Sequence, residues 1–289
     1  MSVTIGEALR FGIEKLRVSG DSPRADAYRL LENFVDCNSA WLIANQHEAL
    51  SESARRCFVA AVERRRSGEP VAYITGRSGF FGASYDVNAD VLVPRPETEH
   101  LVEAALEFLR PRSNVGVLDI GTGSGVIACA IALGLSNVRV DAVDVSGAAI
   151  ATAKKNAGRL GIAGRCRFLI GDLLAPVKGK RYSCIVANLP YIPTPQLPRR
   201  PNSAAFEPKA ALDGGPDGLK LYRRLLPQLR DFLEADSLVL LEAAPPALDR
   251  LFALAREQFP QARCSVHRDY ANIDRFITIA TGSAAIGAE

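Results

Sequence analysis

The spacing of apolar residues changes character once along the chain. Residues 5–67 carry apolar side chains at intervals of three and four, which is typical of amphipathic helices that share one core. From residue 97 to residue 282, short apolar runs alternate with longer helical patterns. This alternation predicts an α/β fold with a mostly parallel sheet covered on both faces. Two short runs, 263–267 and 276–280, are expected to supply a final antiparallel pair, so that the last strand is antiparallel.

These patterns predict two domains joined by a connector. We expect a small N-terminal helical domain over 1–78, a hairpin and linker over 79–96, an α/β domain over 97–282 and a short tail over 283–289. Within the α/β domain, the helical patterns lie at 97–109, 148–160 and 219–233, and a further buried strand lies at 238–241.

Two arginine clusters have both a structural and a functional interpretation. Arg64, Arg65 and Arg66 end a helix that begins near Ser51, and basic side chains there favour the helix dipole, so we interpret them as a solvated helix end. The alternative is a docking patch for an acidic partner. The Pro- and Arg-rich stretch 194–203 predicts a mobile substrate loop, whose Arg199-Arg200 pair could steer an anionic partner.

Composition and charge narrow the classes of function. The chain has 289 residues and 48% hydrophobic residues, which is sufficient for a full core in each domain. Its 35 basic and 32 acidic residues give a net charge of only +3, so the sequence lacks the charge signature of a general nucleic-acid-binding protein. No apolar run has the length of a membrane span, and the start of the chain has no signal-peptide pattern. We therefore expect a cytoplasmic protein.

The cysteines and histidines do not suggest a metal or a catalytic triad. The three histidines are far apart, and the six cysteines show no metal-like pairing, so we expect reduced cysteines in the core and no metal site. The cysteines are Cys37, Cys57, Cys129, Cys166, Cys184 and Cys264.

A glycine-rich turn follows the first predicted strand of the α/β domain. Residues 117–125 read as strand, glycine turn and helix start, and glycines allow the backbone to approach a ligand closely while a helix amino terminus opens towards it. Asp119 places a carboxylate beside this turn. Alone, such a turn is equally consistent with a dinucleotide site or an ordinary tight turn.

Polar residues at the ends of the next strands form an ordered series with this turn. Asp144 ends the second strand, where a carboxylate can bind both hydroxyls of a ribose, and Asp172 ends the third. The fourth strand ends in Asn188-Leu189-Pro190-Tyr191. The Asn carboxamide oxygen can accept a hydrogen bond from a substrate N–H, Pro fixes the backbone so that a carbonyl can accept another, and Tyr offers a flat face. This element is suited to binding a planar amide or amino group.

The series resembles the class I methyltransferases that use S-adenosylmethionine. Further segments resemble the HemK or PrmC family, the glutamine methyltransferases of peptide chain release factors: residues 68–76, 91–99, 206–208 and 213–219, with the Pro-Arg-Pro-Glu-Thr-Glu stretch at 94–99 as the most specific signature. The resemblance extends over nearly the whole chain. It implies a Rossmann-like class I methyltransferase sheet after a helical substrate-recognition domain.

The resemblance also implies a reaction, a cofactor and a partner. S-adenosylmethionine would donate a methyl group to the side-chain amide of the glutamine in a Gly-Gly-Gln loop of a release factor, leaving S-adenosylhomocysteine. We expect a monomer with a protein substrate and neither a membrane nor a nucleic-acid partner. The residues expected to act on the substrate chemically are Asn188, Pro190 and Tyr191, and Arg95, Pro96, Glu97 and Leu189 are expected to join them in binding it.

The cofactor site is expected along the strand ends. Asp144 is assigned to the ribose hydroxyls, Asp172 to the adenine amino group, Leu173 to the adenine face and the glycine turn to the methionine moiety. The complete expected set is Asp119, Gly121, Thr122, Gly123, Ser124, Gly125, Asp144, Val145, Asp172, Leu173 and Asn188.

Departures from the family pattern leave other acceptors open. The family usually has Pro at the position of Leu189, and the Leu form resembles ribosomal RNA adenine dimethyltransferases. Ala205 and residues 243–246 also differ from the usual family residues. The alternatives are therefore an adenine amino methyltransferase acting on RNA or DNA, a methyltransferase for another peptide or small amide, and a non-catalytic cofactor-binding partner protein.

Overall fold

The computed structural model describes residues 3–17 and 22–283. The predicted tail therefore lies, apart from Ser283, outside the described residues. The chain forms two compact units. The helical unit contains the chain up to residue 77 together with 198–207, and the α/β unit contains 78–197 and the chain from residue 208 onward.

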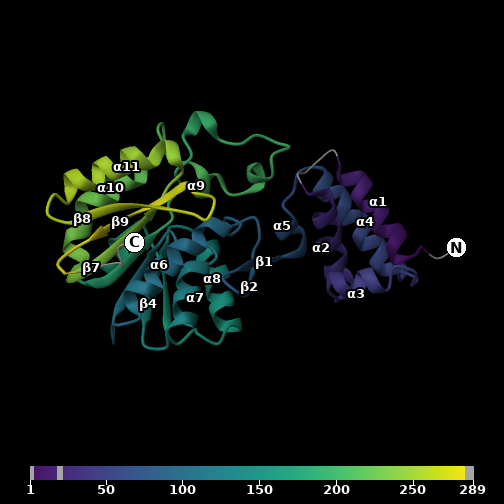
Figure 1. Ribbon diagram of the computed structural model, residues 1–289, viewed down its shortest axis with the longest axis horizontal. Coiled ribbons are helices and arrows are strands. Elements are labelled where there is room, and N and C mark those ends of the chain that lie inside the picture. The colour runs from purple at the N-terminus through teal and green to yellow at the C-terminus, as the bar shows by residue number, and fades with distance from the viewer. Residues whose placement is uncertain (1–2, 18–21, 284–289) are drawn as a thin grey trace. The chain divides into compact units, whose positions relative to one another are not determined.

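The helical unit has one apolar core, as the three- and four-residue spacing predicted. Thr4 begins the first helix with a capping box, in which its hydroxyl accepts from Glu7 N and the Glu7 carboxylate accepts from Thr4 N. Leu9, Leu30 and Phe58, on three different helices, are fully or almost fully buried. The helices are α1 (Ile5–Leu16), α2 (Pro23–Val35), α3 (Ser39–Ala44), α4 (Glu52–Arg66) and α5 (Val71–Thr75) (Figure 1).

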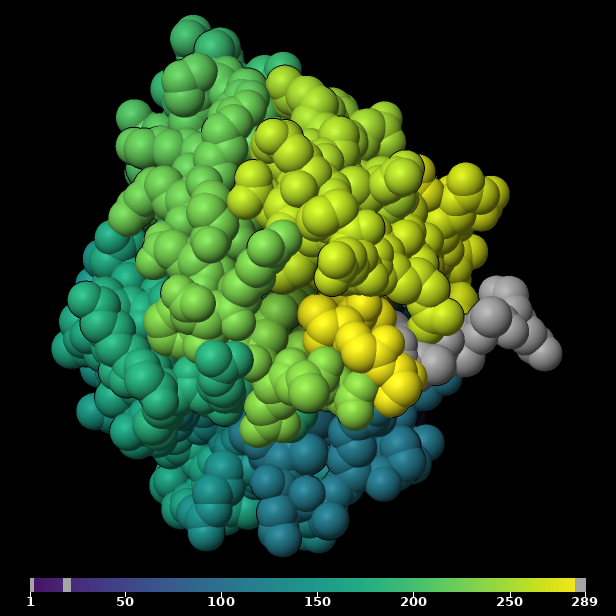
Figure 2. Space-filling model, turned by 90° about the vertical axis from the view of Figure 1, so that its left-hand side faces the viewer, coloured from purple at the N-terminus to yellow at the C-terminus, as the bar shows by residue number. Residues whose placement is uncertain are grey.

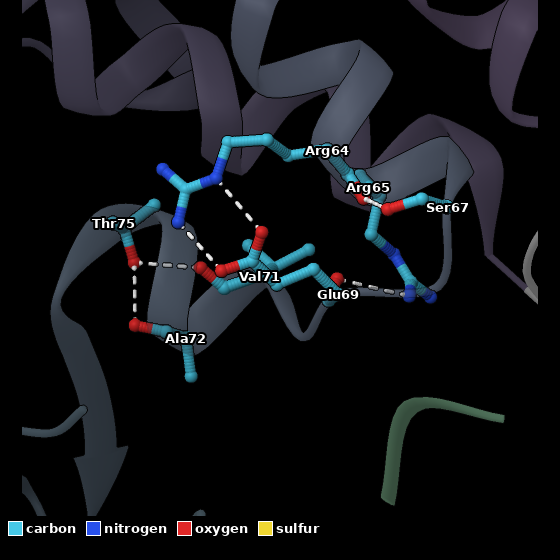
Figure 3. Close-up of polar contacts among 7 residues, drawn as sticks. All are labelled: Arg64, Arg65, Ser67, Glu69, Val71, Ala72 and Thr75. Carbon is cyan, nitrogen blue, oxygen red and sulfur yellow. Dashed lines mark hydrogen bonds and ion pairs between the residues drawn. The ribbon is translucent and has the colours of Figure 1, made fainter. Parts of the chain in front are cut away.

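The arginine cluster at the end of α4 is paired within this unit. The Arg64 guanidinium donates to both carboxylate oxygens of Glu69, at 2.8 and 2.6 Å (Figure 3). Arg65 Nε donates to Asp26 at 2.7 Å, and Arg66 Nε donates to Glu63 at the same distance. These pairs agree with the interpretation of the cluster as a helix end.

Part of the loop after the Asn-Leu-Pro-Tyr element also belongs to the helical unit. Arg65 Nη1 donates to the Ser203 hydroxyl at 2.9 Å. A Cβ atom on Gly68 would lie 2.1 Å from the Pro201 carbonyl oxygen, so only glycine permits this approach. The Arg200 guanidinium lies over the Phe206 ring, 4.1 Å from its centroid. This part of the loop contains the 3₁₀ turn η4 (Ser203–Phe206), and the turn η3 (Thr194–Gln196) precedes it in the α/β unit.

The α/β unit is built on a seven-stranded sheet with strand order β5-β4-β3-β6-β7-β9-β8. The pairs from β5 to β7 are parallel, and the last strand in sequence is antiparallel to both of its neighbours, as predicted. The strands are β3 (Gly116–Ile120), β4 (Arg139–Asp144), β5 (Cys166–Ile170), β6 (Tyr182–Ala187), β7 (Leu233–Glu242), β8 (Arg263–Arg268) and β9 (Asp274–Ala280). A separate two-stranded sheet pairs β1 (Arg77–Phe80) with β2 (Ala83–Asp86), and it begins slightly before the hairpin and linker expected over 79–96.

Both faces of the large sheet are buried, each in its own core. Along β6, Cys184 and Val186 belong to one apolar cluster and Ile185 and Ala187 to the other, because successive side chains point to opposite faces. Helices α6 (Glu99–Leu109), α7 (Val126–Gly134) and α8 (Gly147–Arg159) cover the first face, and α10 (Lys220–Leu225) and α11 (Pro245–Gln258) cover the second (Figure 1). In Figure 2, the green and yellow-green surface of the later part of the chain lies above the blue and teal surface of the earlier part.

The expected helix at 219–233 is shorter in the structure. Residues after α10 form a 3₁₀ helix, η5 (Leu226–Phe232), in which Pro227 has no N–H for the α-helical pattern. Strand β7 begins directly afterwards and is longer than the predicted 238–241. The remaining short helices are η1 (Pro96–Thr98), η2 (Ala175–Val177) and α9 (Lys209–Leu212).

The cysteines are all free thiols, and three of them, Cys129, Cys166 and Cys184, are buried. Cys57 is exposed on α4, so the expectation that every cysteine lies in the core was wrong for this residue. Across the described residues, no helix combines the length and the apolar character needed to cross a membrane.

Candidate active site

The strand order places a crevice between β3 and β6. The chain moves outward from β3 to β4 and β5 and then returns to β6 on the other side of β3, and ligands of open α/β sheets bind at the carboxyl ends of strands beside such a reversal. A cavity of about 390 Å³ opens at this point. Residues that follow four strands line it: Gly121 and Gly123 after β3, Asp144 and Val145 at the end of β4, Gly171, Asp172 and Leu173 after β5, and Asn188, Leu189 and Pro190 after β6.

The turn after β3 depends on glycine. Gly121, Gly123 and Gly125 have φ angles of 74°, 53° and 81°, in the left-handed region that side chains disfavour. A Cβ atom on Gly121 would also lie 2.9 Å from Leu189 Cδ2. The turn therefore packs closely against the Asn-Leu-Pro-Tyr element, so the first and fourth strand ends form one wall.

Asp119 supports this turn from the protein interior. Its side chain is fully buried, and Oδ2 accepts from the Thr122 hydroxyl at 2.6 Å and from Ala128 N at 3.1 Å. Burial raises the pKa of the Asp119 carboxyl to about 7. Thr122 and Ser124 are buried as well. Asp119 does not line the cavity, so its direct contact with a cofactor stays a prediction.

Asp144 and Val145 form a polar and an apolar part of the cavity wall. The Asp144 carboxylate accepts from Gly123 N and from Ser146 N, each at 2.9 Å, and thereby ties β4 to the glycine turn. Val145 lines the cavity and is 68% exposed, so its apolar surface is accessible to a ligand. A carboxylate beside an uncovered apolar surface suits a ligand that combines hydroxyl groups with a planar ring.

Asp172 and Leu173 form the wall after β5. Asp172 is exposed, and its carboxylate pairs with the Arg224 guanidinium from α10. Leu173 is buried and has a φ of 48°, so the backbone turns sharply and presents this residue to the cavity. The Asp172 side chain caps no helix, since η2 begins after Leu174 without a side-chain cap.

Asn188 is held by two oxygen atoms that come from distant parts of the sequence. Its Nδ2 donates to Glu242 Oε1 at 2.9 Å and to Thr98 Oγ1 at 3.2 Å. Neither Glu242 nor Thr98 lines the cavity, whereas Asn188 does. Within the described chain, Asn188 Oδ1 has no hydrogen-bond partner, so the carboxamide oxygen is the atom that remains for a ligand.

Glu242 and Thr98 are site residues that the sequence reasoning missed. Glu242 ends β7 and is 2% exposed, and burial raises the pKa of its carboxyl to about 7. Thr98 ends η1 and is also buried. An acid at the end of a buried strand was the available signal for Glu242, because the same signal identified Asp144. The signal for Thr98 was the Pro-Arg-Pro-Glu-Thr-Glu stretch, but the sequence prediction assigned substrate binding to neighbours of Thr98 in that stretch and not to Thr98 itself.

Those neighbours, Arg95, Pro96 and Glu97, lie on the turn before α6 and do not line the cavity. Glu97 lies 3.8 Å from the Arg275 guanidinium on β9. Tyr191 lies close to Glu97. Burial, together with the nearby charges of Glu242 and Glu97, raises the pKa of the Tyr191 hydroxyl. The structure thus brings the turn near Tyr191, and substrate contact by these three residues stays a prediction.

A glycine-rich loop at 213–219 supports the Asn-Leu-Pro-Tyr element. Gly214 N donates to the Ile192 carbonyl at 2.9 Å. A Cβ atom on Gly214 would lie 2.7 Å from the Pro190 carbonyl oxygen, and one on Gly218 would lie 2.3 Å from that of Tyr191. The backbone after β6 is therefore fixed by contacts that only glycine allows.

Known proteins resemble the chain in sequence and in fold. A family model for the PrmC N-terminal domain matches residues 7–76, and one for the methyltransferase small domain matches 98–196. A release factor glutamine methyltransferase of Moorella thermoacetica is 40% identical over 274 residues, covering 94% of this chain and 97% of that protein. One of Bacillus cereus is 34% identical over 277 residues, with the same coverage of both chains. The solved catalytic domain of hMettl16 shares the fold, with a TM-score of 0.56, 15% identity and coverage of 82% of this chain and 85% of that one.

Proposed function

Since the chain belongs to the PrmC family of release factor glutamine methyltransferases, we propose that it methylates the side-chain amide nitrogen of a glutamine, with S-adenosylmethionine as methyl donor. The proposed acceptor is the glutamine of the Gly-Gly-Gln loop of a peptide chain release factor. The observation that carries the proposal is the Asn188 carboxamide, whose nitrogen is bound by Glu242 and Thr98 while its oxygen is left for the cavity.

The cavity residues suit the proposed cofactor. A carboxylate at Asp144 can accept hydrogen bonds from ribose hydroxyls, and Val145 and Leu173 offer apolar surface to an adenine ring. The glycine turn allows close approach of the amino-acid part, beside the amino terminus of α7, which has no side-chain cap. When bound, S-adenosylmethionine supplies an electrophilic methyl group on a sulfonium sulfur.

The acceptor side of the site has to orient a weak nucleophile. The lone pair of an amide nitrogen is delocalised into its carbonyl group. Hydrogen bonds from the amide N–H groups to Asn188 Oδ1 and to the carbonyl of the Pro190 region would hold the nitrogen with its lone pair towards the methyl carbon. Transfer would form the N–CH₃ bond as the S–CH₃ bond breaks, and the nitrogen would lose a proton to water. Tyr191 would pack on the planar group.

The helical unit is proposed to recognise the protein substrate. Its support is the match of residues 7–76 to the PrmC N-terminal domain and the separate compact unit that these residues form. A protein substrate also agrees with the small net charge, because nucleic-acid binding rests largely on basic contacts to phosphates.

The experiment that tests this function offers the enzyme three acceptors with radiolabelled S-adenosylmethionine. They are a release factor, its variant with the loop glutamine changed to alanine, and ribosomal RNA. We expect label in the unaltered release factor alone. Label in the RNA alone would instead favour the adenine methyltransferase suggested by Leu189, and label in both release factors would place the acceptor outside the loop glutamine.

A further inference from the structure

The carboxyl group of Glu242 lies directly behind Asn188 and has no role in the reaction described above. Its Oε1 accepts from Asn188 Nδ2 at 2.9 Å, and Oε2 is buried without a hydrogen-bond partner. The Thr98 hydroxyl accepts from Asn188 Nδ2 at 3.2 Å, and its interaction with the Glu242 carboxyl lowers the pKa of that carboxyl. These three side chains come from β7, from the turn before α6 and from the end of β6, and they meet inside the α/β unit.

An asparagine side chain can adopt two orientations that differ by exchange of its oxygen and its NH₂ group. Only one orientation gives the acceptor amide an oxygen to bind. In the other, Asn188 would present N–H donors to the N–H groups of the substrate, and its oxygen would face the carboxylate oxygen of Glu242, which can only accept. A buried contact between acceptor atoms without a hydrogen is unfavourable. The surroundings of Nδ2 therefore select the productive orientation.

We propose that Glu242 is a positioning residue, which together with Thr98 fixes the Asn188 carboxamide with its oxygen towards the acceptor nitrogen. This inference rests on the function proposed above for Asn188. Glu242 does not line the cavity, so it acts through Asn188 and not by contact with the substrate.

The fold holds Glu242 in place through its backbone. Glu242 pairs with Phe276 in the antiparallel ladder of β7 and β9. The buried Tyr222 hydroxyl donates to the Glu242 carbonyl oxygen and accepts from Leu189 N at 3.2 Å. One tyrosine thus connects the end of β7 with the element that contains Asn188, so the carboxyl and the carboxamide keep a fixed separation.

The ionisation of Glu242 gives the proposal a distinctive consequence. Burial raises the pKa of the carboxyl to about 7, and the Glu97 carboxylate on η1 raises it further. Arg275 on β9 and the bonds from Thr98 and Asn188 act in the opposite direction. Tyr191 and Tyr222 are also near, since the charge of the Glu242 carboxylate contributes to the raised pKa of both hydroxyls. The carboxylate form can only accept hydrogen bonds, whereas the protonated form can donate one to the oxygen of an inverted Asn188. Turnover should therefore fall as pH decreases through about 7.

The kinetic test compares Glu242→Gln and Glu242→Leu with the wild-type enzyme on a release factor. Leucine removes the hydrogen-bond acceptor of Asn188 Nδ2, so we expect kcat to fall about 10- to 100-fold. The affinity for S-adenosylmethionine should change less than about twofold. Glutamine keeps one acceptor oxygen but cannot titrate, so it should restore part of kcat and give a flat profile from about pH 6 to about pH 8. Glu234→Gln, at the other end of β7, is the matched control and should behave as wild type.

A second measurement needs no release factor. In protein with isotope-labelled asparagine, the NMR signals of the Asn188 side-chain NH₂ should titrate near pH 7 in the wild type and lose this titration in Glu242→Gln. A Leu variant with full kcat, or Asn188 signals that titrate identically in wild type and Glu242→Gln, would overturn the proposal. A wild-type enzyme that labels no release factor would refute the proposed function, while the NMR result would still decide the role of Glu242.

Discussion

The chemistry proposed for this protein depends on which atoms of a few side chains face the cavity. The Asn188 nitrogen is bound behind the wall and its oxygen is not, while the Asp144 carboxylate bonds the glycine turn and still borders the cavity. Protein contacts occupy the Asn188 nitrogen, and each Asp144 carboxylate oxygen accepts one backbone N–H and can accept another hydrogen bond. Both side chains therefore have a defined orientation before a ligand arrives, which reduces the cost of ordering them on binding.

Asp144 is expected to contribute to cofactor affinity. Asp144→Ala should weaken S-adenosylmethionine binding by about 1 to 3 kcal/mol, because ribose hydroxyls would lose an acceptor and Gly123 N would lose its partner. Asp144→Asn, which keeps one oxygen, should lose less. Titration calorimetry on folded variants gives the affinities, and an alanine variant that binds the cofactor as tightly as the wild type would contradict the assignment.

Leu189 stands at a position where the family usually has proline. Because leucine has a backbone N–H and proline does not, the effect of this difference on stability can be measured. Leu189→Pro removes the N–H that donates to the buried Tyr222 hydroxyl, which should lower the free energy of unfolding by about 1 to 3 kcal/mol. In a Tyr222→Phe background, the same change should cost less, since the acceptor is already gone. Denaturant unfolding of the four proteins measures this coupling.

The leucine side chain itself is buried against Gly121. We therefore expect Leu189→Pro to keep its activity on a release factor. A switch of methyl incorporation from release factor to adenine-containing RNA would show that Leu189 defines a different acceptor site.

At the scale of elements, the loop at 213–219 is as important to the site as the strands. Gly218 has a φ of 84°, and an added Cβ would lie 2.3 Å from the Tyr191 carbonyl oxygen. Gly218→Ala should therefore move Tyr191 and reduce kcat by at least about 10-fold, since small displacements of reacting groups are costly. Gly158→Ala, on α8 with no atom within 4 Å of the new Cβ, is the control and should be slightly more stable than wild type. Equal activity of the two variants would contradict the supporting role of the loop.

Most elements of the α/β unit could be predicted from the sequence because they bury regular apolar patterns. The positions of Asp144 and Asn188 at the cavity could be predicted too, since each is a polar residue at the end of an apolar run. Thr98 and Glu242 could not be paired with Asn188, because the contacts join residues 90 and 54 positions apart and no local pattern encodes them. The break of the helix at Pro227 was available in the sequence and was overlooked in favour of the surrounding apolar spacing.

At the scale of the whole molecule, the buried carboxyl of Glu242 couples stability to pH. Its folded-state pKa of about 7 lies above the ordinary value of 4.5, so its contribution to stability is present in full below about pH 4.5 and is lost as pH rises through about 7. Between about pH 4 and about pH 8, the free energy of unfolding of the wild type should therefore fall relative to that of Glu242→Gln. The expected change is on the order of 3 kcal/mol, because one pKa unit corresponds to about 1.36 kcal/mol.

Denaturant unfolding of both proteins across this range checks the sign. The comparison with Glu242→Gln is necessary because Asp119, another buried carboxyl with a raised pKa, contributes in the same direction in both proteins. A difference between the two proteins that is constant with pH would contradict a raised pKa for Glu242.

The proposed reaction depends most on the Asn188 carboxamide, which is expected to orient the acceptor nitrogen. The most direct measurement is the single-turnover rate of methyl transfer to a release factor by Asn188→Ala, together with its affinity for S-adenosylmethionine. We predict a rate lower by about 100-fold or more and an affinity within about threefold of wild type, since the lost interaction acts on the transfer step. A folded Asn188→Ala protein that transfers the methyl group at the wild-type rate would contradict the account.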